Sequence, residues 1–225
     1  MKLIYQGKTK NVYENSDGTY TLKLKDDATG KDGVFDPGEN TVGLNIAGLG
    51  RESLKLTKYF FEKLIEEGIP THYLGCNIED VTMQVKPAEF FGNGLEFICR
   101  RRAGGSFIKR FGTYIDAGAD LDYLVEVTLK DDTRQDPPVT KDILETLQIM
   151  TAEEYETCKS LTKAITKKIA ADLNAKGMEL QDIKFEFGKN DGEVLLIDEI
   201  SGGCMRVYKD GDLLHPMDLT KFILG

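Results

Sequence analysis

Residues 182–199, DIKFEFGKNDGEVLLIDE, constrain the fold most, because charged and apolar side chains alternate along their first half at a period of two. Successive side chains of a β-strand point to opposite faces, so this segment has one packed face and one charged face. The packed face holds Ile183, Phe185 and Phe187, and the charged face holds Asp182, Lys184 and Glu186. The charged face must therefore meet water or a ligand.

A turn near Asn190 is expected to reverse the chain, so that a second strand returns antiparallel to the first. In that register Asp198 lies roughly opposite Asp182, and two facing carboxylates repel unless a cation lies between them. One interpretation is a solvated strand face that Lys184 neutralises. The other is a Mg²⁺ site, because Asp198 and Glu199 end a strongly apolar strand. The residues alone leave both interpretations open.

The rest of the chain mixes predicted strands with two predicted long helices. Residues 2–27 alternate apolar and polar positions around a Ser-Asp-Gly turn, a pattern typical of an antiparallel meander. Apolar residues recur at helical spacing from Arg51 to Glu67, before Gly68, and again from residue 152 to Gly177, after the capping residue Thr151. Further strands are predicted at residues 71–77, 82–91 and 95–105.

Residues 28–50 contain several glycines and one proline, so we predict a long loop there. We place one domain boundary between residues 86 and 87. It separates a β-rich N-terminal part, residues 1–86, from a larger α+β part, residues 87–225.

The formal net charge of −9 argues against a nonspecific hold on nucleic acid. No segment reaches the roughly 18 apolar residues of a membrane helix, and the first residues lack the apolar region of a signal peptide. Four scattered cysteines and two histidines supply few ligands for structural zinc. We therefore predict a cytoplasmic protein whose partners are small molecules, with no nucleic acid and no membrane.

Two basic segments interrupt this acidic chain. GKTKNVY, residues 7–13, places a glycine and two lysines in a turn that could approach a polyphosphate or could be a plain polar hairpin. RRRAGGSFIKR, residues 100–110, surrounds a Gly-Gly-Ser turn with cations and suits a phosphate or carboxylate, although a solvated basic loop would look the same.

Taken in order, several motifs resemble the SAICAR synthetase family. They are GKTKNVY, LKDDAT, LIEEGIPTHY, RRRAGGSFIKRFG, LKDDTRQDPP and GMELQDIKFEFG with GEVLLIDEIS, followed by Arg206. This resemblance covers nearly the whole chain. It implies a two-part α+β fold whose antiparallel N-terminal part looks like the nucleotide-binding part of protein kinases and ATP-grasp proteins.

The resemblance also implies a reaction. An imidazole carboxylate ribonucleotide, carboxyaminoimidazole ribonucleotide, would condense with L-aspartate at the expense of ATP, through an acyl phosphate, in purine biosynthesis. ATP and Mg²⁺ would be the cofactors, and a homodimer is possible. A different carboxylate or amine, in a specialised pathway, and a small-molecule phosphotransferase are the alternatives.

Site residues follow from the same resemblance. The ATP site would comprise Lys8, Lys10, Lys86, Lys130, Glu186 and Asp198, of which Glu186 and Asp198 would also bind Mg²⁺. The ribonucleotide phosphate would bind Arg100, Ser106 and Arg206. The catalytic residues would be Asp182, Lys184 and Arg206, the first two lying between the two substrates.

The chain departs from the family pattern at several positions. Gly203 stands where the family has an aspartate, Arg101 replaces an asparagine, and Asn45 is the remnant of a longer asparagine motif. An added arginine and a lost carboxylate would make the acceptor pocket more cationic. The segment HPMDLTKF retains little of a charged family motif, and the last helix of the family is not expected after it.

Overall fold

The α+β prediction is confirmed by a computed structural model, which describes residues 1–31, 33–39 and 41–225. The α-helices are α1 (Leu49–Glu66), α2 (Gly105–Phe111), α3 (Lys141–Thr146), α4 (Ala152–Ala175) and α5 (Pro216–Leu224), and a 3-10 helix covers Asp132–Arg134. The first eight strands are β1 (Lys2–Gln6), β2 (Lys10–Glu14), β3 (Tyr20–Leu24), β4 (Asp27–Lys31), β5 (Val34–Phe35), β6 (Val42–Asn45), β7 (Tyr73–Asn77) and β8 (Thr82–Val85). The others are β9 (Glu89–Phe90), β10 (Leu95–Arg102), β11 (Asp120–Leu129), β12 (Glu179–Asn190), β13 (Glu193–Ile197), β14 (Met205–Lys209) and β15 (Asp212–Leu213).

The chain divides into two compact units that interleave along the sequence. Unit 1 comprises residues 1–89, 188–203 and 215–225, and unit 2 comprises residues 90–187 and 204–214. A single boundary near residue 87 was expected, whereas the chain passes between the units four times. None of the helices in the described part of the chain is long and apolar enough to cross a membrane.

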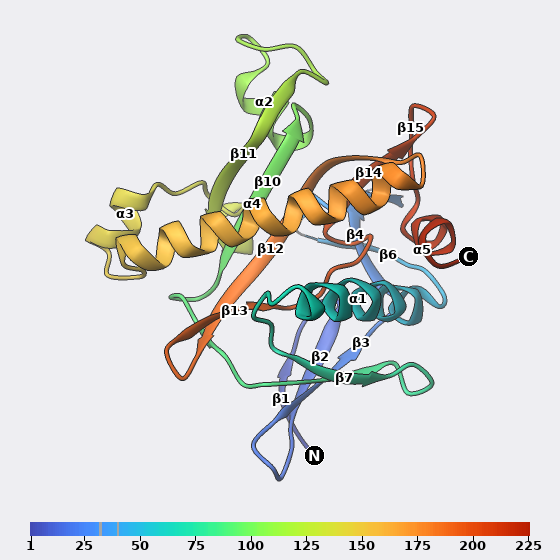
Figure 1. Ribbon diagram of the computed structural model, residues 1–225, viewed down its shortest axis with the longest axis vertical. Helices are drawn as coiled ribbons and strands as arrows, with labels where there is room; N and C mark the ends of the chain where they lie inside the picture. The colour runs from blue at the N-terminus through green and yellow to red at the C-terminus, as the bar shows by residue number, and fades with distance from the viewer. Residues whose placement is uncertain (32, 40) are drawn as a thin grey trace. The chain divides into compact units, whose positions relative to one another are not determined.

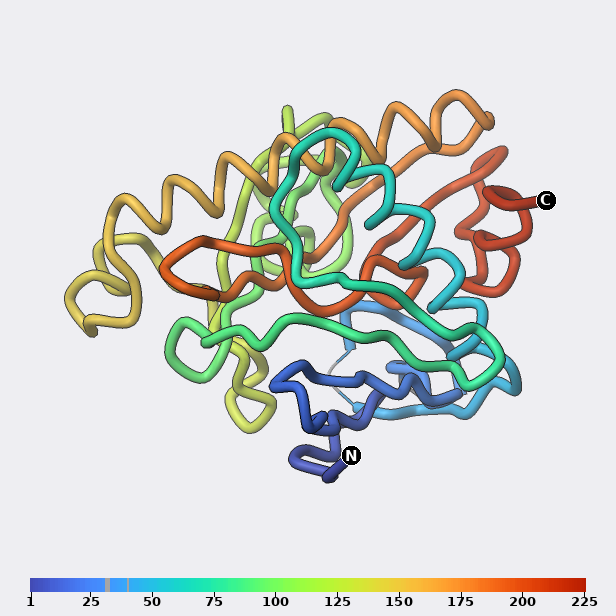
Figure 2. Tube along the Cα trace, turned by 60° about the horizontal axis from the view of Figure 1, so that its bottom comes forward, coloured from blue at the N-terminus to red at the C-terminus, as the bar shows by residue number. Residues whose placement is uncertain are grey.

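Unit 1 is built on a five-stranded antiparallel sheet with the order β1-β2-β3-β8-β7. Its first three strands form the predicted meander (blue in Figure 2), and Gly18 takes a φ of 82° in the second turn. Helix α1 packs on the strands of unit 1 with one apolar face, on which Leu54 and Phe61 are fully buried. The amphipathic pattern therefore identified the helix correctly.

Helix α1 begins at Leu49, two residues earlier than predicted. The carboxylate of Asp26 accepts hydrogen bonds from the backbone N–H groups of Gly48 and Gly50, both at 2.9 Å. A distant aspartate therefore satisfies free N–H groups at the helix start and complements the helix dipole. Gly68, with a φ of 76°, follows the last turn.

The prediction of one long loop over residues 28–50 is wrong for the described residues of that range. Strands β4, β5 and β6 form a separate three-stranded antiparallel sheet there, in the order β5-β4-β6. A Cβ atom on Gly30 would lie 2.2 Å from the carbonyl oxygen of Val34, and one on Gly43 would lie 2.4 Å from that of Gly30. The glycines thus allow strands to approach closely and do not mark irregular chain.

Unit 2 contains a sheet in which β11, β10, β12, β14 and β15 are successive neighbours. Helix α4 lies across it (Figure 1) and contacts β10 and β11. The predicted cap is confirmed, because Thr151 and Glu154 form a complete capping box at the start of α4. Phe97, Phe185 and Phe187 fill the core beside the helix and are at most 1% exposed.

Residues 216–224, which include most of the HPMDLTKF segment, form helix α5, a helix that the sequence analysis did not predict. His215 caps α5 through its Nδ1 atom, which accepts a hydrogen bond from the N–H of Met217 at 3.4 Å, and Pro216 opens the first turn. The helix packs on α1 within unit 1, where Leu219 and Ile223 are buried.

Candidate active site

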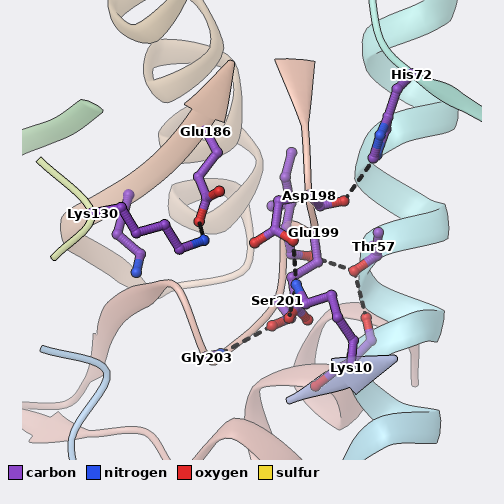
Figure 3. Close-up of polar contacts among 12 residues, drawn as sticks. Lys10, Thr57, His72, Lys130, Glu186, Asp198, Glu199, Ser201 and Gly203 are labelled. Atoms are coloured by element: carbon purple, nitrogen blue, oxygen red, sulfur yellow. Dashed lines mark hydrogen bonds and ion pairs between the residues drawn. The ribbon is translucent and has the colours of Figure 1, made fainter. Parts of the chain in front are cut away.

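In unit 1 the predicted residues Lys10 and Asp198 meet directly. The ammonium of Lys10, at the start of β2, donates to the carboxylates of Asp198 and Glu199, the latter at 3.0 Å. All three side chains are at most about a quarter exposed. One cation therefore holds two adjacent carboxylates at the end of β13 (Figure 3).

The position of these carboxylates follows from the strand before them. Residues Val194–Ile197 of β13 are buried, so the first polar residues after the strand lie where it leaves the core. Asp198 then takes a left-handed backbone conformation, with a φ of 69°. The next residues are also anchored, because the hydroxyl of Thr57 lies 3.2 Å from the carbonyl oxygen of Ile200 and Ser201 Oγ accepts from the N–H of Gly203 at 3.1 Å.

His72, which the sequence analysis did not single out, contacts Asp198 from the other side. Its Nε2 atom lies 3.0 Å from the carbonyl oxygen of Asp198, and the residue is 4% exposed. Burial lowers the pKa of His72 to about 4, against the opposing effect of this hydrogen bond. The imidazole is thus neutral near pH 7.

The remaining predicted ATP-site residues of unit 1 lie on turns and strand ends. Lys8 is exposed in the tight turn between β1 and β2, where the N–H of Gly7 donates to the carbonyl of Lys10 at 2.9 Å. Lys86 follows β8, and its N–H donates to the carbonyl of His72 at 2.7 Å. Asn45 donates to the carboxylate of Asp27 at 3.0 Å, which stabilises the small sheet.

Unit 2 contains the predicted phosphate-binding residues in one network, in which Arg100 and Asp182 are buried and Ser106 is exposed. Arg100, on β10, is 2% exposed and donates to the carboxylates of Glu126 and Asp182 and to Ser106 Oγ, the last two at 3.3 and 3.0 Å. Arg206, on β14, donates to both oxygens of Asp182 at 3.1 and 3.0 Å. Two guanidinium groups therefore share one buried carboxylate.

Strand register explains this arrangement and corrects an earlier prediction. Asp182 of β12 is paired with Arg100 on β10 and with Arg206 on β14, so both sides of the strand are occupied at this residue. Asp198 is therefore not the strand partner of Asp182, and the predicted register of this hairpin is wrong. The chain reverses at Asp191 and Gly192, directly after β12 ends at Asn190, as the predicted turn near Asn190 required.

A second pair of ion pairs lies further along β12. Lys184 donates to Glu96 at 2.7 Å, and Lys130 donates to Glu186 at 2.6 Å. Thr128 also donates to Glu96, at 3.0 Å. Glu96 and Glu186 oppose each other in register on β10 and β12, and each like charge is neutralised by its own lysine.

The charged face of β12 is thus not the solvated surface that was one of the two interpretations. Asp182 and Glu186 are only 4% and 6% exposed, so the solvated alternative is wrong for them. Lys184 is about a third exposed. The opposite face is apolar and buried as predicted, with Ile183, Phe185 and Phe187 in the core.

Arg101, one of the departures from the family pattern, contacts residues of unit 2. Its Nη1 atom donates to the backbone carbonyl of Leu180 at 3.1 Å, and its guanidinium lies 5.5 Å from the centre of the Tyr123 ring. This arginine packs within unit 2 and satisfies the backbone of β12 beside a register shift. A contribution of Arg101 to the charge of the acceptor pocket stays a prediction.

Gly203 is the other position at which the chain departs from the family pattern, and few atoms lie near the place that a Cβ atom would take. A Cβ atom there would meet only Ser201 Oγ, at 3.3 Å, and its φ is not in the left-handed region. The backbone therefore accepts an aspartate at this position.

Sequence reasoning missed the acidic partners of the predicted cations. Glu96 and Glu126 each stand in a strand that is otherwise largely apolar, and Glu126 receives both Arg100 and Arg110. A lone acid in a buried strand needs a cationic partner, and the basic run at residues 100–110 supplies those of Glu126. That signal was available in the sequence, whereas the register that pairs the groups was not.

The described residues contain no group of three or more histidine, cysteine, aspartate or glutamate side chains arranged to hold a metal ion. The donor set of Asp198 and Glu199 nevertheless suits Mg²⁺, because it offers two adjacent carboxylates that already converge on one cation, the ammonium of Lys10. Further oxygen ligands would come from the nucleotide phosphates.

A separate cleft of about 560 Å³ lies in unit 2. Its walls include Arg102, Asn174, Gln181 and Tyr208. None of the predicted catalytic or substrate residues lines it, and Arg102 is already paired with Glu179 and Asp120. The cleft is therefore distinct from the ionic networks.

Comparison with known proteins gives one consistent result. The SAICAR synthetase family model matches residues 3–218. The phosphoribosylaminoimidazole-succinocarboxamide synthase of Clostridium tetani is 58% identical over the full length of both chains. A solved structure described as a type-2 SAICAR synthetase in complex with ADP has a TM-score of 0.83 and 28% identity, and covers 98% of this chain and 91% of its own. The corresponding synthase of Ehrlichia chaffeensis has a TM-score of 0.84 and 26% identity, with coverage of 100% and 92%.

Proposed function

This chain belongs to the SAICAR synthetase family, and on that premise we propose that it is an ATP-dependent carbon–nitrogen ligase of purine biosynthesis. It condenses carboxyaminoimidazole ribonucleotide with L-aspartate and releases ADP and phosphate. The observation that carries the proposal is the 58% identity to the Clostridium tetani enzyme over the full length of both chains. Nothing in the comparisons favours a different acid or amine, or a phosphotransferase.

On this proposal, ATP binds to the predicted lysines and carboxylates, which lie on turns and at strand ends. The ADP complex of a similar structure supports nucleotide use. Lys8 and Lys10 lie in and after a tight turn whose backbone and ammonium groups suit a polyphosphate, and Lys130 is paired with Glu186 through an ammonium that is about half exposed. These lysines neutralise phosphate charge as it develops during transfer.

Asp198, with Glu199 beside it and Glu186 as the second predicted ligand, would hold Mg²⁺. When bound, the ion neutralises the phosphate oxygens and acts as a Lewis acid on the transferring group. The protein's own part is to present carboxylate oxygens at the end of a rigid strand. Lys10, which now holds Asp198 and Glu199, is then available to the phosphates.

The ribonucleotide phosphate would bind beside Arg100, Ser106 and Arg206. Support comes from the geometry of unit 2, where two guanidinium groups donate to Asp182 and one of them also donates to the hydroxyl of Ser106. Arginine suits this role because its planar donors match phosphate oxygens in pairs. Asp182 fixes the direction of both arginines before the substrate arrives.

The chemistry proceeds in two displacements. An oxygen of the substrate carboxylate attacks the γ-phosphorus of ATP, and ADP leaves, which gives an acyl phosphate. The amine of aspartate then attacks the acyl carbon, the carbon–oxygen bond to phosphate breaks, and the amine loses a proton. Lys184, held by Glu96, and Asp182 are the groups proposed to position the reacting carboxylate and amine.

A coupled assay tests the function. Purified protein with carboxyaminoimidazole ribonucleotide, aspartate and Mg-ATP should form the amide, with ADP and free phosphate released in equal amounts. ADP release without free phosphate would indicate a phosphotransferase. Amide formation only with another amine would indicate a changed substrate, and no turnover with any acceptor would overturn the proposal.

We also propose that the protein acts in the cytoplasm and as a homodimer, as the sequence suggested. The acidic net charge of −9 is consistent with small-molecule substrates rather than nucleic acid. Sedimentation of the purified protein would give its mass and so test the dimer.

A further inference from the structure

The buried side chain of His72 contacts the backbone between Asp198 and Glu199, the two residues whose carboxylates accept from Lys10. Its Nε2 atom lies 3.0 Å from the carbonyl oxygen of Asp198, as the dashed line in Figure 3 shows. A carbonyl oxygen can only accept, so Nε2 carries the hydrogen and donates it. The ring is enclosed, at 4% exposure, and packs 5.7 Å from the ring of Phe61.

The backbone of His72 is fixed on both sides as well. Its N–H donates to the carbonyl of Leu196 at 3.0 Å, and its carbonyl accepts from the N–H of Lys86 at 2.7 Å. Thr71 also forms a parallel bridge with Leu196. His72 therefore joins the end of β13 to the segment after β8 by three hydrogen bonds.

The carbonyl that His72 holds belongs to the peptide between Asp198 and Glu199. The orientation of that peptide plane depends on ψ of Asp198 and φ of Glu199, and so affects the direction of both side chains. Asp198 has a φ of 69°, a conformation that costs a non-glycine residue about 1 kcal/mol and is stable only when its surroundings fix it. The imidazole is a buried donor that does so.

We propose that His72 is a positioning residue that orients the Asp198–Glu199 peptide, so that both carboxylates point to Lys10 and to a nucleotide-bound Mg²⁺. The metal part of this inference rests on the proposed function. Groups that orient metal ligands from behind typically alter metal affinity by about 10- to 100-fold when they are removed. His72 reaches its carboxylates through the backbone and not through their oxygens.

Two substitutions separate the hydrogen bond from the shape of the side chain. His72→Leu removes the donor and fills most of the space, whereas His72→Gln keeps an amide N–H donor. Binding of Mg-ADP, measured by calorimetry, should weaken by about 10- to 100-fold in His72→Leu and recover most of that loss in His72→Gln. Binding of ADP with the metal chelated should change by less than about threefold in both variants. Should His72→Leu not fold, His72→Asn, whose amide is too short to reach the carbonyl, replaces it.

A double-mutant cycle tests whether His72 acts through Asp198. In an Asp198→Asn background the loss caused by His72→Leu should shrink, because the carboxylate that it orients is gone. His215→Asn, which keeps a capping group on α5, is the matched control and should bind Mg-ADP as the natural protein does. Independent, multiplicative losses in the cycle, or equal losses with and without the metal, would overturn the inference.

The binding readout distinguishes this inference from the proposed function. If the protein binds Mg-ADP but forms no amide, the ligase proposal fails and the role of His72 is still decided by the cycle. If the enzyme is an active ligase and His72→Leu binds Mg-ADP within threefold of the natural protein, only the inference fails. A protein that binds no Mg-nucleotide at all would overturn both.

Discussion

Arg100 and Asp182 occupy opposed positions on neighbouring antiparallel strands, and the arginine Nη1 atom lies 3.3 Å from Oδ2 of the aspartate. Both side chains are almost fully buried, at 2% and 4% exposure. A buried pair is stable only when further partners satisfy both charges, and Glu126, Ser106 and Arg206 supply them here. The fold thus fixes the guanidinium groups in place without substrate.

Arg100→Lys should therefore impair both stability and function. One ammonium cannot replace three directed contacts to Glu126, Asp182 and Ser106, so buried carboxylate charge would be left without its partners. We expect the free energy of unfolding to fall by about 3 kcal/mol and kcat/KM for the ribonucleotide to fall by about 100-fold or more. Urea unfolding and steady-state kinetics measure the two effects.

Arg102→Lys is the matched control on the same strand. Arg102 is about a third exposed, and its partners Glu179 and Asp120 are about half exposed or more, so the change should alter stability by at most about 0.5 kcal/mol. Equal effects of the two substitutions would contradict the role assigned to the buried network.

Glu96→Gln should reduce turnover and leave nucleotide binding intact. Glu96 holds the ammonium of Lys184 at 2.7 Å, and an amide would hold it less firmly. We expect kcat to fall by about 10- to 100-fold, with the KM for ATP changed by less than threefold. Glu89→Gln, at an exposed position, is the control and should behave as the natural protein. A rise in the KM for ATP alone would place Lys184 at the nucleotide instead.

Periodicity predicted much of this fold, because strand and helix patterns depend on local sequence. The alternation in residues 182–187 assigned both faces of β12 correctly, and the apolar stripe of α1 found the helix to within two residues. The capping box at Thr151 was likewise local. Such features need no knowledge of distant partners.

Register and glycine-rich segments could not be predicted in this way. The opposed positions of Asp182, Arg100 and Arg206 depend on which strands become neighbours of β12, a property of the whole sheet. Gly30 and Gly43 suggested a loop, but their role is to allow close approach between paired strands of the small sheet. His72 gave no signal at all, since its partner is a backbone carbonyl 126 residues away.

Asp198→Asn should separate metal binding from folding. Asparagine also tolerates a positive φ, and Glu199 remains on Lys10, so the backbone at residue 198 should persist. We expect the midpoint of thermal unfolding to change by only a few degrees, while kcat/KM for Mg-ATP falls by about 100-fold or more. Titration of Mg²⁺ at fixed ATP gives the second value, and Asp210→Asn, at an exposed turn, is the control. Unchanged activity would exclude Asp198 as a metal ligand.

The pH dependence of stability should report on His72. In the folded protein burial lowers its pKa from 6.5 to about 4, so the unfolded chain binds more protons than the folded one between these values. The free energy of unfolding that His72 contributes is therefore fully present above pH 6.5 and is lost as the pH falls towards 4. Since one pKa unit corresponds to about 1.4 kcal/mol, the loss by pH 4.5 should be about 2 kcal/mol.

His72→Gln isolates this contribution from the many carboxylates that titrate in the same range. Glutamine does not titrate, so the variant should gain about 2 kcal/mol relative to the natural protein between pH 7.5 and pH 4.5. Urea unfolding at several pH values in this window measures the difference directly. If the two curves of unfolding free energy run parallel across the window, the imidazole is not held neutral in the folded protein. Its Nε2 hydrogen bond to Asp198 would then be formed by a cation.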